Sequence, residues 1–254
     1  MIVVAITGAS GVIYGIRLLE TLKKLNIENS LVISDAARIV IESETDYTAE
    51  EVIGLADTYY DFNDLTASIN SGSFKADGLA IVPCSMKTLS SIANGYGANT
   101  ITRVADVFLK ERRNIVIVPR ETPLRSIHLQ NMLTLSQEGA TILPAMPGFY
   151  SAHDTVDDQI NFIVGKILDS LKIENDIYDT KSFIFSERAV YISNMLQRCL
   201  YFLHFFSPLI NMLLFEIFLE SLLTGAAYSR LNKNIINSVK QKPRWHRKLK
   251  HIGC

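Results

Sequence analysis

Short apolar segments alternate along the chain with longer segments that are apolar on one face only. The apolar segments have the length and β-branched composition of buried strands, and they lie at residues 1–6, 29–34, 77–83, 114–119 and 140–145. The segments between them carry apolar residues at helical spacing and predict helices at residues 11–25, 36–44, 85–94, 124–139 and 155–171. Strands that are apolar throughout, separated by amphipathic helices, indicate a parallel sheet covered on both faces. We therefore predict a three-layer α/β fold with a doubly wound sheet, Rossmann-like or flavodoxin-like.

Each predicted strand is followed by a short polar segment. In chain order these segments are TGAS, SDAA, PCSMKT, PRETP and PAMPGFY. Ligands of open parallel sheets bind beyond the carboxyl ends of the strands, where such segments meet. We expect the five to converge on one crevice.

The last part of the chain has a different character. Residues 1–181 contain 15 Lys and Arg against 23 Asp and Glu, whereas residues 182–254 contain 10 against 3. The second part begins with two very apolar predicted helices and ends in a basic segment with one Trp. We predict two domains, 1–181 and a helical extension 182–254 that contacts a membrane surface or another subunit. Glu216 and Glu220 argue against a transmembrane span, and the basic end lacks a nucleic-acid-binding module.

The overall composition limits the function classes. The net charge of −1 and the 48% hydrophobic content are ordinary for a folded protein. Three scattered cysteines fit neither a disulfide framework nor a CxxC metal site, so we expect a reducing, cytoplasmic setting. The amino terminus has no basic segment typical of a signal peptide. His128 and His153 have no partner at metal-ligand spacing, and we predict no metal site.

The glycine-rich turn after the first strand leaves three interpretations open: a dinucleotide loop, a flavin loop or a structural bend. Gly8, Gly11 and Gly15 allow sharp backbone turns and bring amides of a helix start near an anion, while Thr7 and Ser10 add hydroxyl donors. The G-x-G-x-x-G pattern is absent, and no Tyr is followed by Lys four residues later. Nicotinamide binding is therefore disfavoured.

The later strand-end segments carry more chemistry. Ser85 and Thr88 can cap a helix whose amides face a phosphate, or Ser85 is only a cap. Arg120 can bind phosphate in a bidentate manner and Glu121 can transfer a proton, unless the two form an ion pair that closes the strand end. We interpret Cys84 as a small buried apolar residue rather than a nucleophile.

Several of these segments together closely resemble the UbiX/Pad1 family of flavin prenyltransferases. The resemblance covers residues 1 to about 180 and rests on TGASGVIYGIRLL, SDAARIVIESETD, INSGSF, VPCSMKTLSSIANGYGANTITRVADVFLKERR and VPRETPLRSIHLQNMLTLSQEGATILPAMPGFY. The wider group of homo-oligomeric flavin-containing decarboxylases shares the fold and an ANT…AD segment. SMKT and PRETP favour the UbiX side of that group.

The resemblance implies transfer of a dimethylallyl group from dimethylallyl monophosphate to N5 and then C6 of reduced FMN, without a divalent metal. It assigns flavin binding to Gly8, Ala9, Ser10, Ser34, Ser85, Met86, Lys87, Thr88 and Arg120. It assigns prenyl phosphate binding to Lys110, Arg120, Tyr150 and Lys166, with Glu44 and Arg103 completing the site from a neighbouring subunit. Ser10 and Glu121 are the candidates for proton transfer.

The same resemblance implies a dodecamer and a UbiD-type decarboxylase that uses the prenylated FMN. Two other functions stay open at this point. One is a flavin-dependent decarboxylase of aromatic acids, and the other is a non-catalytic flavin carrier.

Overall fold

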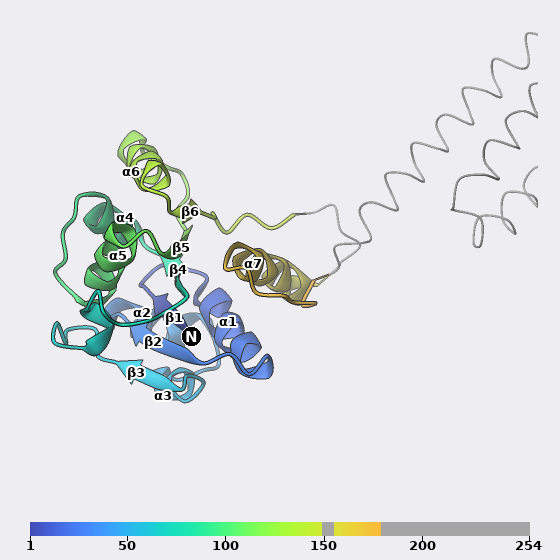
Figure 1. The fold of residues 1–254 in the computed structure, drawn as a ribbon. Helices are drawn as coiled ribbons and strands as arrows, with labels where there is room; N and C mark the ends of the chain where they lie inside the picture. The colour runs from blue at the N-terminus through green and yellow to red at the C-terminus, as the bar shows by residue number, and fades with distance from the viewer. Residues whose placement is uncertain (149–154, 179–254) are drawn as a thin grey trace, which may run out of the picture. The chain divides into compact units, whose positions relative to one another are not determined.

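A computed structural model of the chain describes residues 1–148 and 155–178. Within these residues one sheet holds six parallel strands in the order β3-β2-β1-β4-β5-β6 (Figure 1). The strands are β1 Ile2–Ile6, β2 Asn29–Ile33, β3 Thr58–Tyr60, β4 Gly78–Cys84, β5 Asn114–Pro119 and β6 Thr141–Ile142. This is the strand order of a doubly wound Rossmann-like sheet.

Helices cover both faces of the sheet. They are α1 Val12–Lys24, α2 Asp35–Glu44, α3 Ala49–Ile53, α4 Met86–Ala93, α5 Thr100–Lys110, α6 Ser126–Gln137 and α7 Val156–Ser170, with a 3₁₀ turn, η1, at Ser68–Asn70. Helices α1, α2 and α7 bury their apolar sides in one core, and α4 and α5 bury theirs in a second core across the sheet. Figure 1 shows α4, α5 and α6 on the opposite side of the sheet from α1 and α7. The predicted three-layer α/β fold is confirmed.

The strands are apolar throughout because both of their faces are covered. In β1, Val4 and Ile6 belong to the core under α1, whereas Val3 and Ala5 belong to the core under α5. All four side chains are at most 1% exposed. Alternate residues of a strand point to opposite faces, so a strand between two helical layers has no polar side.

The elements differ from the predicted ones at the edges of the sheet. The edge strand β3 was not predicted, because its three residues Thr-Tyr-Tyr are partly exposed and pair with β2 alone. The strand predicted at 140–145 is reduced to the two residues of β6. Short edge strands bury little apolar surface and therefore leave a weak sequence pattern.

Helix α1 lies unusually close to the sheet. A Cβ atom at Gly15 would lie 2.5 Å from the carbonyl oxygen of Val82 in β4. Only glycine permits this approach, and it places the start of α1 at the boundary between β1 and β4.

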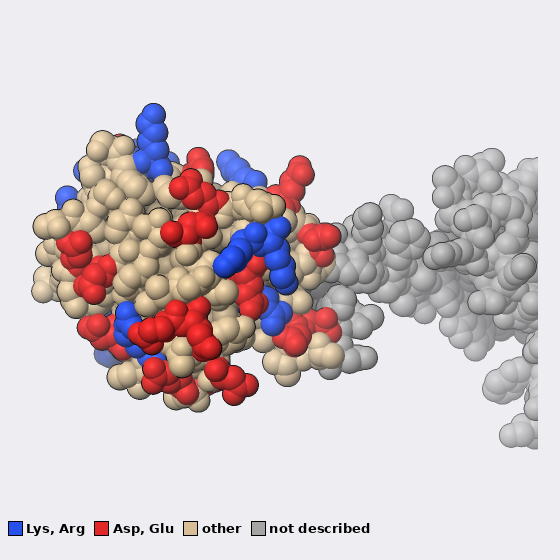
Figure 2. Space-filling view, turned by 90° about the horizontal axis from the view of Figure 1, so that it is seen from below, with Lys and Arg blue, Asp and Glu red and all other residues tan. Residues whose placement is uncertain are grey.

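The surface of the described part is rich in acidic groups. Figure 2 shows Asp and Glu side chains spread over the face on the side of β3 and α3. Exposed acidic residues of this region include Asp46, Glu50, Glu51 and Asp57. The predicted extension 182–254 lies outside the described residues, and within them no helix has the length and hydropathy needed to cross a membrane.

Candidate active site at the carboxyl ends of the strands

The order in which strands are added to the sheet reverses between β1 and β4. From β1 the chain continues to β2 on one side, and it later returns to β4 on the other side. Such a switch point opens a crevice beyond the carboxyl ends of the two strands. The segments TGAS and PCSMKT meet at this point, with SDAA and PRETP next to them. The fifth predicted segment, PAMPGFY, is described only as far as Gly148.

Backbone hydrogen bonds tie these strand ends to one another. They run from Ser34 N to Ile6 O (3.0 Å), from Thr7 N to Pro83 O (3.2 Å) and from Arg120 N to Cys84 O (3.2 Å). Each bond joins a residue just beyond one strand to the end of a neighbouring strand. The predicted convergence of four segments is therefore a property of the fold.

The hydroxyl of Thr7 holds the two central strand ends together. Its Oγ1 donates to the carbonyl oxygen of Pro83 (2.8 Å) and accepts from the amide of Ser85 (2.7 Å). Thr7 is only 1% exposed. Thr7 was expected to offer a hydroxyl to an anion, but both of these bonds are internal to the protein.

Two serine-capped helices begin at the crevice. The side chain of Ser34 accepts from Ala37 N at the start of α2, and that of Ser85 accepts from Thr88 N at the start of α4. A cap satisfies one amide of the first turn, and the helix provides no partner for its other first amides. In α4 these include the amides of Met86 and Lys87. The start of α4, which has no acidic residue in its first turn, therefore attracts an anion, as predicted for Ser85, which is a cap in either interpretation; the first turn of α2 already contains Asp35.

The glycines of the first loop serve different purposes. A Cβ at Gly8 would lie 2.4 Å from the Cβ of Ala36, so glycine lets the loop touch the start of α2. Gly11 has a φ of +92° and needs glycine for its left-handed backbone. Ser10 lies between them, exposed to solvent.

The side chain of Glu44, the last residue of α2, contacts the glycine-rich loop of its own chain. Its Oε2 accepts a hydrogen bond of 2.7 Å from the amide of Gly11, the residue that precedes α1. We expected Glu44 to complete the site of a neighbouring subunit, whereas here it contacts the loop next to Ser10. The carboxylate occupies the amino end of α1, where a negative charge is favoured.

Arg120 and Glu121 follow β5 at the same edge. Arg120 is half-buried, and its Cγ lies 4.0 Å from the point where a Cβ of Gly11 would be. Glu121 is exposed and accepts from the amide of Thr122 (3.1 Å). No ion pair joins Arg120 to Glu121 in the described part of the chain, so the alternative of a structural ion pair is wrong.

Not all of the other predicted substrate-binding residues lie near this crevice. Lys110 ends α5 just before β5 begins, 3.8 Å from the Glu111 carboxylate, and so lies toward the amino edge of the sheet. Arg103, in the first turn of α5 and so at the other end of that helix from Lys110, pairs with Asp106 at 3.1 Å. Tyr150 lies outside the described residues.

Lys166 is engaged by the segment that follows α7. Its Nζ donates to the hydroxyl of Tyr178 (2.8 Å) and lies 3.7 Å from the carboxylate of Asp169. The end of α7 is beside the start of β5, where Ser170 O accepts from the Asn114 side chain (3.0 Å). Lys166 therefore also lies nearer the amino edge than the crevice.

Cys84 and Tyr14 are the titratable side chains of the site with a displaced pKa. Burial raises the pKa of the fully buried Cys84 thiol far above its ordinary value, which agrees with the interpretation of an apolar core residue. Burial also raises the pKa of Tyr14, while the positive charge of Arg120 acts in the opposite direction. Sequence reasoning missed Tyr14 because its position in α1 has no local chemical signal.

Comparisons with known proteins agree with this geometry. The fold and the site are those of a flavoprotein, and the family model described as Flavoprotein matches residues 1–169. The flavin prenyltransferase UbiX of Methanothermobacter thermautotrophicus is 54% identical over 178 residues, which cover 70% of this chain and 93% of that protein. UbiX of Methanocaldococcus jannaschii is 52% identical over 177 residues, covering 70% and 96%. The chain belongs to the UbiX family of flavin prenyltransferases.

Two solved structures are similar over the same part of the chain. One is AnUbiX (PadA1) in complex with FMN and dimethylallyl pyrophosphate, with a TM-score of 0.69 and 47% identity, covering 70% of this chain and 95% of that one. The other is a dodecameric FMN-dependent UbiX-like decarboxylase from Escherichia coli O157:H7, with a TM-score of 0.69 and 45% identity, covering 70% and 97%.

Proposed function

We propose that this chain transfers a dimethylallyl group from dimethylallyl monophosphate to reduced FMN and so forms prenylated FMN. The observation that carries the proposal is the meeting of two capped helix starts, the Ser10 loop and Arg120 at one switch point. Relatives of about 50% identity are named flavin prenyltransferases. FMN supplies the nucleophilic ring that accepts the prenyl group.

The donors of the crevice fit a flavin that carries a phosphate. The first amides of α4 and the ammonium of Lys87 suit an anionic group. The loop from Gly8 to Ser10 has little side-chain bulk, so a flat ring can approach its backbone. We therefore propose that flavin is held by Gly8, Ala9, Ser10, Ser34, Ser85, Met86, Lys87, Thr88 and Arg120.

Three residues carry the chemistry in this proposal. The guanidinium of Arg120 holds the phosphate as the bond from the allylic carbon to its oxygen breaks, because it can neutralise the leaving group. The Ser10 hydroxyl and the Glu121 carboxylate exchange protons with the flavin edge as the new carbon bonds form. Glu44 accepts from the amide of Gly11 in its own chain, and in this proposal it borders the substrate site beside the Ser10 loop without contacting the phosphate.

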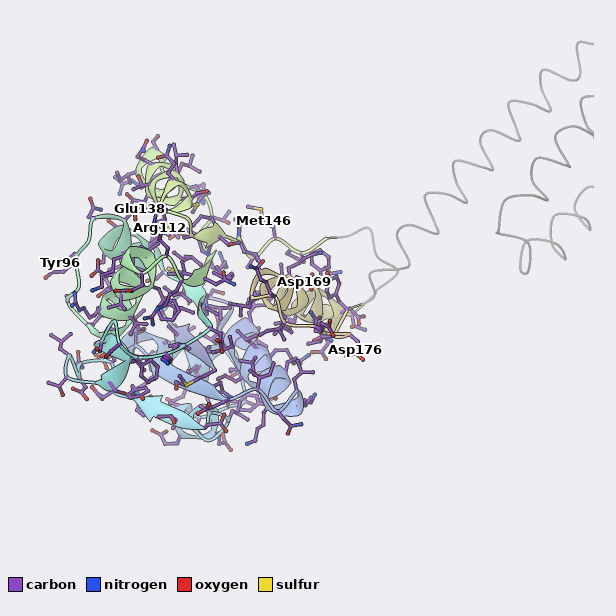
Figure 3. All side chains as sticks on the ribbon, viewed as in Figure 1. Tyr96, Arg112, Glu138, Met146, Asp169 and Asp176 are labelled. Atoms are coloured by element: carbon purple, nitrogen blue, oxygen red, sulfur yellow. The ribbon has the colours of Figure 1, made fainter. Side chains whose placement is uncertain are left out.

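We also propose that a second copy of the chain completes the site. Lys110 and Lys166 lie toward the amino edge of the sheet of their own chain, so we expect them, together with Arg103, to reach a prenyl phosphate in another copy. Helix α6 carries three large apolar side chains that are about half exposed in the single chain: Ile127 (48%), Leu129 (53%) and Leu133 (51%). A cluster of exposed apolar side chains is typical of a surface that another subunit covers. Figure 3 shows Tyr96 and Met146, also exposed, projecting from the surface. A dodecamer like that of the Escherichia coli relative fits this expectation.

The flavin mass is the decisive test. The protein is incubated with reduced FMN and dimethylallyl monophosphate without oxygen, and the released flavin is weighed by mass spectrometry. A gain of one prenyl unit is expected. Release of CO₂ from an aromatic acid by the protein alone would instead support a decarboxylase, and tightly bound unchanged flavin would support a carrier.

Variants of the neighbouring pair test the roles of the residues. Glu121→Gln is expected to bind FMN normally and to turn over slowly, whereas Arg120→Ala is expected to raise KM for the prenyl phosphate. Unchanged turnover in both variants would remove these assignments. Mixing subunits that carry Arg120→Ala with subunits that carry Lys110→Ala should restore part of the activity, since mixed oligomers contain some intact shared sites.

The partner and the compartment stay predictions. We propose that a UbiD-type decarboxylase uses the product and that both proteins are cytoplasmic. Addition of the reaction mixture to an apo-decarboxylase of that type, followed by measurement of CO₂ release, tests the first of these.

A further inference from the structure

The side chain of Tyr14 borders the crevice but has no role in the site described so far. A Cβ at Gly11 would lie 3.0 Å from two ring atoms of Tyr14 and 4.0 Å from Cγ of Arg120. The phenol ring and the stem of Arg120 therefore flank the same glycine, whose amide is bonded to Glu44.

The hydroxyl of Tyr14 has no hydrogen-bond partner among the described residues. Its ring packs against the core under α1, and the residue is half-buried. No hydrogen bond to the hydroxyl is made by any residue in 1–148 or 155–178. Tyrosine hydroxyls in partly buried surroundings usually have a hydrogen-bond partner, so a hydroxyl without one calls for an explanation.

We propose that the Tyr14 hydroxyl binds ligand together with Arg120, by donating a hydrogen bond to an anionic oxygen of FMN or of the prenyl phosphate. A guanidinium carries only donors, and a phenol that keeps its proton can donate its O–H to the same anionic oxygen. Burial favours the protonated form of Tyr14, as the direction of its pKa shows. The inference rests on the proposed function, because that function supplies both anions.

Removal of the hydroxyl alone tests the inference. Tyr14→Phe keeps the ring that packs on Gly11 and removes the donor. Tyr60→Phe is the matched control, since its hydroxyl already bonds Ser68 at 2.9 Å and the residue lies on the edge strand β3, which β2 separates from β1. Calorimetry measures FMN binding to the apo-protein and dimethylallyl monophosphate binding to the FMN-loaded protein, so neither measurement needs turnover.

Tyr14→Phe is expected to raise one of these two dissociation constants about tenfold, as for a lost hydrogen bond to a charged group. A weaker FMN affinity identifies the flavin oxygen as the acceptor. A weaker affinity for the prenyl phosphate, with FMN binding intact, identifies the phosphate. Tyr60→Phe should leave both constants at the wild-type values.

Arg120→Lys provides a second measurement. If Tyr14 and Arg120 bind the same oxygen, the double variant should lose less affinity than the sum of the single losses. Unchanged dissociation constants in Tyr14→Phe overturn the inference. Strictly additive losses of affinity in the double variant also overturn it, because the weaker binding of Tyr14→Phe would then come from altered packing. If the wild type binds both compounds but forms no prenylated flavin, the proposed function fails while the binding test still stands.

Discussion

Thr7→Val should loosen the crevice without disturbing the core. Valine has nearly the shape of threonine, so the change removes only the hydroxyl that bonds Pro83 O at 2.8 Å and Ser85 N at 2.7 Å. Pro83 O keeps its hydrogen bond from Thr7 N, so losing the second bond, from the Thr7 hydroxyl, costs about 1 kcal/mol. Ser85 N loses its partner in a partly buried position, which costs about 1–2 kcal/mol. The expected destabilisation is therefore about 2–3 kcal/mol.

Thermal unfolding and FMN titration together check this value. For a chain of this size the loss corresponds to a melting temperature lower by about 4–12 °C. FMN affinity should also fall, because Ser85 begins α4, the helix that we propose to face the flavin. The matched control is Thr21→Val, since Thr21 is also buried and its hydroxyl only bonds Arg17 O one turn earlier in α1. Equal melting temperatures for the two variants would refute the role assigned to Thr7.

Three further outcomes are expected. Gly8→Ala would place a methyl group 2.4 Å from the Cβ of Ala36 and should weaken FMN binding, whereas Gly54→Ala, with its nearest neighbour at 3.4 Å, should not; equal titration curves would contradict this. Burial raises the pKa of the Cys84 thiol, so iodoacetamide at pH 8 should modify it only after urea unfolding, as peptide mass mapping will show. Gly165→Ala would bring a methyl group within 2.0 Å of the Tyr178 ring and should lower the melting temperature, but much less in a Tyr178→Ala background; an equal drop in both backgrounds would exclude this contact.

The central fold could be predicted from sequence because its signal is redundant. The strands β1, β2, β4 and β5 are buried on both faces, so nearly every position in them contributes to the apolar pattern that predicts a strand. The edge strand β3 and the two-residue β6 have no such redundancy, since their pairing depends on neighbours that the chain reaches only after folding. Once these strands were predicted, their carboxyl ends were known as well. The meeting of the polar segments that follow them at one edge of a parallel sheet was therefore predictable.

The partners of individual side chains were less predictable. Thr7 and Ser10 stand three residues apart in the same loop, yet one is buried in bonds to β4 and the other is exposed. Glu44 reaches Gly11 across 33 residues of sequence, and no local pattern encodes that contact. Such pairings depend on how α2 packs beside α1, which is a tertiary property.

The Glu44 contact changes what the glycine-rich loop can bind. A loop of this composition before a helix usually offers its amides to a phosphate. Here the Gly11 amide is bonded to a carboxylate at 2.7 Å, and a phosphate in the same place would be repelled by that charge. The start of α4 has no acidic residue in its first turn, whereas α2 begins with Asp35. We therefore expect the flavin phosphate at the start of α4, which leaves the Ser10 loop, Glu44 and Arg120 around the reacting edge of the ring.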